Sequence, residues 1–74
     1  MSRRPDAVAK AVGGRIRQLR MKKEWSQERL ADESAMHRSY MWGVEHGRRN
    51  PSLRNLTRIA TALDVTLASL FKGL

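Results

Sequence analysis

The sequence predicts an all-α fold built from five short helices. Apolar residues recur at spacings of three and four along most of the chain, which indicates amphipathic helices. β-Branched and aromatic residues never alternate with polar ones over a useful length, so strands are not expected. A chain of 74 residues holds one domain with one modest core. We therefore expect residues 1–74 to form a single domain in which residues 1–5 are flexible.

The charge of the chain favours a polyanionic partner. Fifteen Lys and Arg residues against seven Asp and Glu residues give a formal charge of +8. In the segment from Met36 to Asn55, only Glu45 opposes the basic residues, which are Arg38, Arg48, Arg49 and Arg54. This central segment is expected to form a positive face rather than a merely soluble basic surface.

Several classes of protein are excluded by what the sequence lacks. The absence of cysteine excludes a disulfide framework and thiolate metal ligands, and no third ligand stands near His37 and His46. We find no phosphate-cradling glycine motif, no paired carboxylates and no nucleophile beside a base, so we expect no enzyme, no cofactor and no small-molecule ligand. No signal-peptide or membrane-spanning run occurs, so we expect a cytoplasmic protein that does not associate with a membrane.

The first helix is expected from about residue 6 to 23, with Pro5 in its first turn. Its apolar residues fall on one stripe, formed by Val8, Val12, Ile16 and Leu19. Gly13 and Gly14 are each unfavourable in a helix by about 1 kcal/mol relative to alanine. Either the chain packs closely at these glycines or the helix starts after them.

Two short helices are expected next, separated by only three or four residues. Ser26 offers a hydroxyl that caps the second helix. The third helix runs from about 38 to 45, because Tyr40, Met41 and Val44 have helical spacing and Gly47 stops it. His37 either caps this third helix or leaves its start frayed. Two short helices joined by a tight turn predict a helix-turn-helix.

The last two helices supply the rest of the core. Ser52 can cap a fourth helix, whose apolar residues are Leu53, Leu56, Ile59, Ala60 and Leu63. Residues 64–66 break it, and a final helix from about 67 to 72 carries a stripe formed by Leu67, Leu70, Phe71 and Leu74. This stripe is large for so short a helix. We expect part of it to close the core and the rest, with exposed parts of the fourth helix, to form a two-fold dimer interface, unless the whole stripe is core.

Five motifs resemble the phage repressor and Cro (XRE) family over roughly residues 12 to 71. They are Ile16-Arg17-x-Leu19-Arg20, Ser26-Gln27-x-x-Leu30-Ala31, Arg38-Ser39-Tyr40-Met41-x-x-Val44-Glu45-x-Gly47, Asn50-Pro51-Ser52-Leu53 and Ile59-Ala60-x-Ala62-Leu63. Within that family, the stretch from Met36 to Asn50 is most similar to controller proteins of restriction-modification systems. The resemblance implies a lambda-repressor-like DNA-binding domain, in which the second and third helices form the helix-turn-helix.

The third helix is the expected recognition helix, because side chains near the start of a helix in the major groove meet the base edges. Arg38 matches guanine, and Ser39 lies beside it. One turn further, Trp42 and Gly43 are expected on the same outward face, where Gly43 lets the groove approach. Trp42 has three open placements: on a sugar or thymine methyl, folded back onto the domain, or in a protein contact. Arg49 is expected to reach a groove edge.

The remaining polar residues are assigned to phosphates or to the fold itself. Gln27 is similar to the family glutamine that holds a phosphate, and we also assign phosphate contacts to Tyr40, Arg48 and Asn50. Glu45 is similar to a family glutamate that pairs with an arginine at the end of the first helix, here Arg20. We expect this ion pair to be structural.

Together these patterns predict a sequence-specific transcriptional regulator that binds a pseudo-palindromic operator on double-stranded DNA as a homodimer. Its two recognition helices would lie roughly 34 Å apart. We expect no effector domain after Leu74, so concentration would set its activity, as in an autoregulatory controller. The alternatives are the antitoxin of a toxin pair, which would have a toxin as second partner, and a non-specific nucleic-acid coat.

Overall fold

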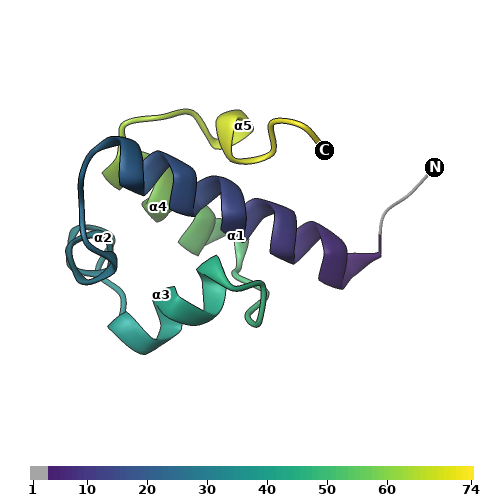
Figure 1. The fold of residues 1–74 in the computed structure, drawn as a ribbon, viewed down its shortest axis with the longest axis horizontal. Coiled ribbons are helices and arrows are strands. Elements are labelled where there is room, and N and C mark those ends of the chain that lie inside the picture. Colours follow the sequence, from purple (N-terminus) through teal and green to yellow (C-terminus); the bar gives the residue numbers. More distant parts are fainter. Residues whose placement is uncertain (1–3) are drawn as a thin grey trace.

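A computed structural model describes residues 4–74, and within that range all regular structure is helical. Figure 1 shows the helices, which are α1 (Pro5–Lys22), α2 (Gln27–Glu33), α3 (Arg38–Glu45), α4 (Leu53–Leu63) and α5 (Leu67–Leu70). The predicted five-helix fold is therefore confirmed. The flexible start expected at residues 1–5 falls partly on residues 1–3, which lie outside the described residues. Pro5 already belongs to α1.

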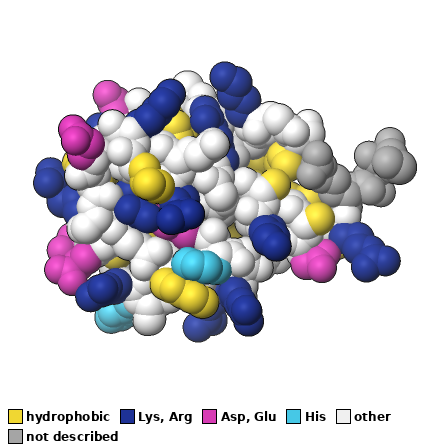
Figure 2. Space-filling view, viewed as in Figure 1, with side chains coloured by type: hydrophobic (Ala, Val, Ile, Leu, Met, Phe, Trp, Pro, Cys, Tyr) yellow, Lys and Arg dark blue, Asp and Glu magenta, His cyan; other side chains and the backbone are white. Residues whose placement is uncertain are grey.

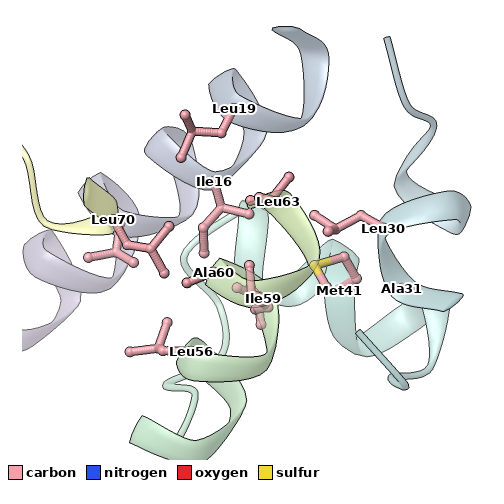
Figure 3. Close-up of a cluster of buried hydrophobic side chains, with 12 residues drawn as sticks. Ile16, Leu19, Leu30, Ala31, Met41, Leu56, Ile59, Ala60, Leu63 and Leu70 are labelled. Atoms are coloured by element: carbon pink, nitrogen blue, oxygen red, sulfur yellow. The ribbon is translucent and has the colours of Figure 1, made fainter. Parts of the chain in front are cut away.

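The helices surround one apolar core, to which each of them contributes. α3 packs against α1 and α2, α4 contacts α1 and α2, and α5 closes on α1 and α4. Figure 3 shows side chains from these helices pointing toward one another. The buried apolar residues are Val12, Ile16, Leu19, Leu30, Ala31, Met41, Val44, Leu56, Ile59, Ala60, Leu63 and Leu70. Because α3 buries only one face, its other face is left on the surface.

Helix α1 runs unbroken through both glycines. A Cβ atom at Gly13 would lie only 2.2 Å from the backbone oxygen of Val44, whereas a Cβ at Gly14 would meet nothing within 4 Å. Gly13 therefore allows the backbones of α1 and α3 to touch. The close-packing interpretation is confirmed for Gly13, and the late helix start is wrong.

Hydroxyl side chains cap three helices. The Ser26 hydroxyl accepts a hydrogen bond from the backbone N–H of Arg29 at 2.9 Å, and Ser52 caps α4 in the same way as predicted. Thr66 caps α5, and this cap was not predicted from the sequence. Within the described residues, the imidazole of His37 does not cap α3, although the backbone oxygen of His37 accepts the N–H of Met41 at 3.0 Å. α3 thus starts in regular form without a side-chain cap.

The C-terminal elements differ from the prediction in two places. Leu53, expected on the apolar stripe of α4, is exposed, because it occupies the first turn before the helix meets the core. α4 ends at Leu63, and its C-cap residue Asp64 is left-handed, with a φ of 59°. The final helix was expected to reach residue 72, but α5 ends at Leu70 and residues 71–73 form a turn.

Replacing Gly13 with alanine should destabilise the domain by about 1 to 3 kcal/mol or more, because the new methyl group collides with backbone atoms that a rotamer change cannot move. Gly14→Ala is the matched control. It should stabilise the domain by about 0.5 to 1 kcal/mol through helix propensity alone. Urea unfolding of both variants measures the difference, and equal effects would contradict the close contact between α1 and α3.

Candidate nucleic-acid interface

The turn between α2 and α3 fixes how the two helices are oriented relative to each other. α2 ends at Glu33 and α3 begins at Arg38, so four residues separate them. Ala35 is left-handed, with a φ of 57°, and the backbone N–H of Met36 donates to the oxygen of Ala31 at 2.8 Å. This bond satisfies the carbonyl of Ala31 in the last turn of α2 and lets the chain reverse tightly. The result is the predicted helix-turn-helix.

A buried ion pair fixes the end of α3 to α1. The guanidinium of Arg20 grips the carboxylate of Glu45 with two bonds, from Nε to Oε2 at 2.7 Å and from Nη2 to Oε1 at 2.9 Å. The Glu45 side chain is 0% exposed and that of Arg20 is 12% exposed. Arg20 also donates to the backbone oxygen of Trp25 at 2.8 Å. The expected structural pair is therefore present, and it also holds the loop that leads into α2.

Gln27 joins this network, which the sequence reading did not foresee. Its amide Nε2 donates to Oε1 of Glu45 at 3.1 Å, so one of its two amide N–H groups stabilises the buried carboxylate. Gln27 itself is half-buried at the start of α2. Its role in the free chain is thus to connect α2 with α3, and only the second N–H is left for the expected phosphate contact.

The outward face of α3 carries Arg38, Ser39 and Trp42, as expected. All three are exposed. The Arg38 side chain is 71% exposed and lies 3.3 Å from the carboxylate of Glu28, whose side chain is 62% exposed. An ion pair so open to water is weak and separates readily. The Arg38 guanidinium can therefore leave Glu28 for a ligand.

Gly43 does not share this outward face, which corrects the prediction. It is buried, and a Cβ atom there would lie 2.6 Å from Cγ of Arg49. The missing side chain makes room for Arg49, not for a DNA groove. The loop after α3 brings Arg49 there, because the backbone oxygen of Gly43 accepts the N–H groups of Arg48 and Arg49 at 2.8 and 3.2 Å.

The loop that follows α3 carries exposed residues, one of which lies beside a side chain of α3. Arg48, Arg49 and Asn50 are exposed, and the guanidinium of Arg49 lies 5.8 Å from the ring centre of Tyr40. The half-buried Tyr40 accepts a hydrogen bond from the amide of Asn55 at 3.1 Å, which connects α3 with α4. Figure 2 shows Lys and Arg side chains on both sides of the surface over α3. Because Glu45 is buried and paired, the charge that α3 and this loop present is positive.

The residues expected at a dimer interface divide between core and surface. Leu70 is 1% exposed and belongs to the core, which corrects its assignment to the interface. Leu67 and Phe71 are half-buried, and Leu74 is 48% exposed. Beside Phe71 lies an apolar hollow of about 340 Å³, whose walls include Val8 and Val12 of α1. Apolar surface thus remains open at this end of the domain.

The position of α5 depends on Arg15, whose contact with α5 was not predicted from the sequence. Nε of Arg15 donates to the backbone oxygen of Ser69 at 2.9 Å, and Nη2 donates to the Ser69 hydroxyl at 3.1 Å. These two residues are 54 positions apart, and the neighbouring residues gave no sign of the contact. Arg15 therefore holds the short α5 against α1.

Two features do not occur among residues 4–74. No cluster of three or more His, Cys, Asp or Glu side chains that could hold a metal ion occurs among them. None of the helices described is long and apolar enough to cross a membrane.

Comparison with known proteins gives one consistent answer. A family model described as a helix-turn-helix domain matches residues 11–70. The chain is 46% identical over 54 residues to the control protein C.BamHI of Bacillus amyloliquefaciens, which covers 72% of this chain and 67% of that protein.

Two solved structures resemble most of the chain. The restriction-modification controller protein C.AhdI from Aeromonas hydrophila superposes with a TM-score of 0.86 at 49% identity, covering 88% of this chain and 98% of that one. The biofilm regulator SinR, solved in complex with DNA, superposes with a TM-score of 0.78 at 32% identity, covering 82% of this chain and 98% of that one.

Removing Arg20 should weaken the fold strongly. Arg20→Leu leaves the carboxylate of Glu45 buried without its cation, and such uncompensated charges cost about 3 to 5 kcal/mol. Glu28→Ala breaks the exposed pair with Arg38 and should change stability by no more than about 0.5 kcal/mol. Urea unfolding at neutral pH compares the two variants. A similarly small loss in Arg20→Leu would show that the buried pair does not anchor α3.

Proposed function

The chain belongs to the helix-turn-helix domain family, and from this premise we propose how it reads DNA. It is a DNA-binding transcriptional regulator. We propose that it binds a pseudo-palindromic operator as a homodimer, with α3 in the major groove of each half-site. The observation that carries this proposal is the exposed, positive face of α3, whose opposite face is fixed to the core.

Base reading is assigned to the outward face of α3. Arg38 stands at the first position of the helix, and its guanidinium can donate two bonds to O6 and N7 of guanine once it leaves Glu28. Ser39 lies next to it, and Trp42 follows one turn later. Arg49 approaches the same edge from the loop, across Gly43.

Phosphate contacts are assigned to the flanks of α3. Arg48 and Asn50 are exposed in the loop, and the second amide N–H of Gln27 is available at the start of α2. The hydroxyl of Tyr40 already accepts a bond from Asn55, so it can donate its own proton to a phosphate oxygen. Such contacts fix the register of the protein on the duplex, whereas base contacts choose the sequence.

Dimerisation is assigned to the open apolar end of the domain. Phe71 and Leu67 are half-buried, Leu74 is exposed, and the hollow beside Phe71 offers a complementary surface. A two-fold axis there would bring each Leu74 toward the hollow of the other copy. Two recognition helices about 34 Å apart would then read successive turns of the duplex.

The similarity to C.BamHI and C.AhdI favours a restriction-modification controller over an antitoxin. In that role the protein would act in the cytoplasm on its own operator, without an enzymatic step. A weak dimer would make operator binding rise steeply with protein concentration, which suits a timing switch.

Arg38→Ala should weaken binding to the preferred operator by about 1 to 3 kcal/mol and relax the preference at one base pair in each half-site. Arg48→Ala should weaken binding evenly across sequences and reduce the salt dependence. A selection on random duplexes, read by sequencing, followed by affinity titrations at several salt concentrations, measures both effects. The assignment of reader and clamp fails if both variants lower affinity uniformly.

Leu74→Asp should raise the dimer dissociation constant about tenfold or more, because two apolar side chains leave a symmetric interface. Met21→Asp, which alters another exposed apolar side chain at the far end of α1, is the control and should not change it. Sedimentation equilibrium measures the association, and circular dichroism verifies that both variants are folded. Equal association of the two variants would show that Leu74 does not belong to the interface.

A further inference from the structure

Two aromatic side chains are stacked on the outward face of α3. The rings of Trp42 and His46 have centroids 3.9 Å apart and planes inclined by 15°. Nδ1 of His46 lies 2.8 Å from the backbone oxygen of Trp42. Because a carbonyl oxygen only accepts, Nδ1 carries the proton and holds the imidazole in place. The pair is thus a preformed flat surface, in which His46 fixes the orientation of the indole.

This surface is left open by the domain itself. Met41 and Val44, on the other face of α3, are 0% and 1% exposed, so they supply the contacts with the core. Trp42 remains 46% exposed even with His46 against it. When a partner covers a large apolar ring, the free energy falls because apolar surface leaves water. Little conformational entropy is lost in this case, because the ring is already ordered.

The charges around the stack indicate which partner covers it. Arg38 lies one helical turn before Trp42, and Arg48 and Arg49 follow His46, all three with exposed side chains. Figure 2 shows a hydrophobic side chain and a histidine beside Lys and Arg side chains at the edge of the molecule where α3 lies. An apolar surface framed by three arginines fits duplex DNA, since the arginines meet phosphates or base edges while the rings meet an apolar group.

The major-groove edge of DNA offers one apolar group, the C5-methyl of thymine, and 5-methylcytosine presents the same methyl at the same position. We infer that the stack formed by Trp42 and His46 contacts a C5-methylated pyrimidine in the operator. The inference rests on the proposed function, because it needs α3 in the major groove. It adds Trp42 as the reader of this methyl group and His46 as its positioning residue.

The experiment removes or adds single methyl groups in the operator. Each thymine of the selected operator is replaced in turn by deoxyuridine, and each cytosine by 5-methylcytosine, and the affinity is measured by fluorescence titration. At one position of the half-site, a single deoxyuridine should lower the affinity of the wild-type protein about fourfold, or a single 5-methylcytosine should raise it about fourfold. The first result identifies thymine as the contacted base, and the second identifies a methylated cytosine.

Variants connect the effect to the stack. Trp42→Ala should abolish the methyl dependence, His46→Ala should reduce it, and His46→Phe, which keeps a stacked ring, should retain it. Met21→Ala removes an exposed apolar side chain far from α3 and should leave it unchanged. Thermal melting verifies that each variant is folded.

Three outcomes would overturn the inference. They are wild-type affinity that responds to no single methyl group, a methyl dependence that survives Trp42→Ala, and loss of dimer instead of methyl dependence in Trp42→Ala. A methyl dependence unchanged in His46→Ala would overturn the role of the stack. The proposed function fails separately, if the wild-type protein prefers no duplex over random DNA.

Discussion

The buried ion pair between Arg20 and Glu45 is the constraint on which the surface of α3 depends. A helix of eight residues is not stable alone in water, because the free-energy cost of nucleating the helix exceeds the stabilisation from so few hydrogen bonds. Here the last residue of α3 is held by two bonds from α1, and Gln27 adds a bond from α2. α3 is therefore fixed to the domain at Glu45, and the face that points away from the core stays exposed.

Close packing supports this arrangement where the core is small. At Gly13 the backbones of α1 and α3 touch, so two helices approach without intervening side chains. Arg15 of α1 holds α5 in place by polar bonds to Ser69. A rigid scaffold of this kind lowers the entropy lost on binding, because the side chains that meet DNA project from a helix that is already in position.

Sequence patterns predicted the elements better than the contacts between them. The stripe of α1 and the caps at Ser26 and Ser52 depend on residues close together in the chain, so periodicity revealed them. Gly43 was misplaced because the course of the following loop decides what covers it, and that course is not local. The bond from Gln27 to Glu45 joins residues 18 positions apart, whereas the stack of Trp42 on His46 has a spacing of four that could have indicated it.

The central claim is that the outward face of α3, with its following loop, meets the duplex. The most direct test is a nuclear magnetic resonance titration of isotope-labelled protein with its selected operator, monitoring backbone amides and the tryptophan indoles. The account predicts that the largest shifts occur at Arg38, Ser39 and Trp42 and in the loop at Arg49. Largest shifts on the outer surface of α1, around Met21, with α3 unaffected, would contradict it.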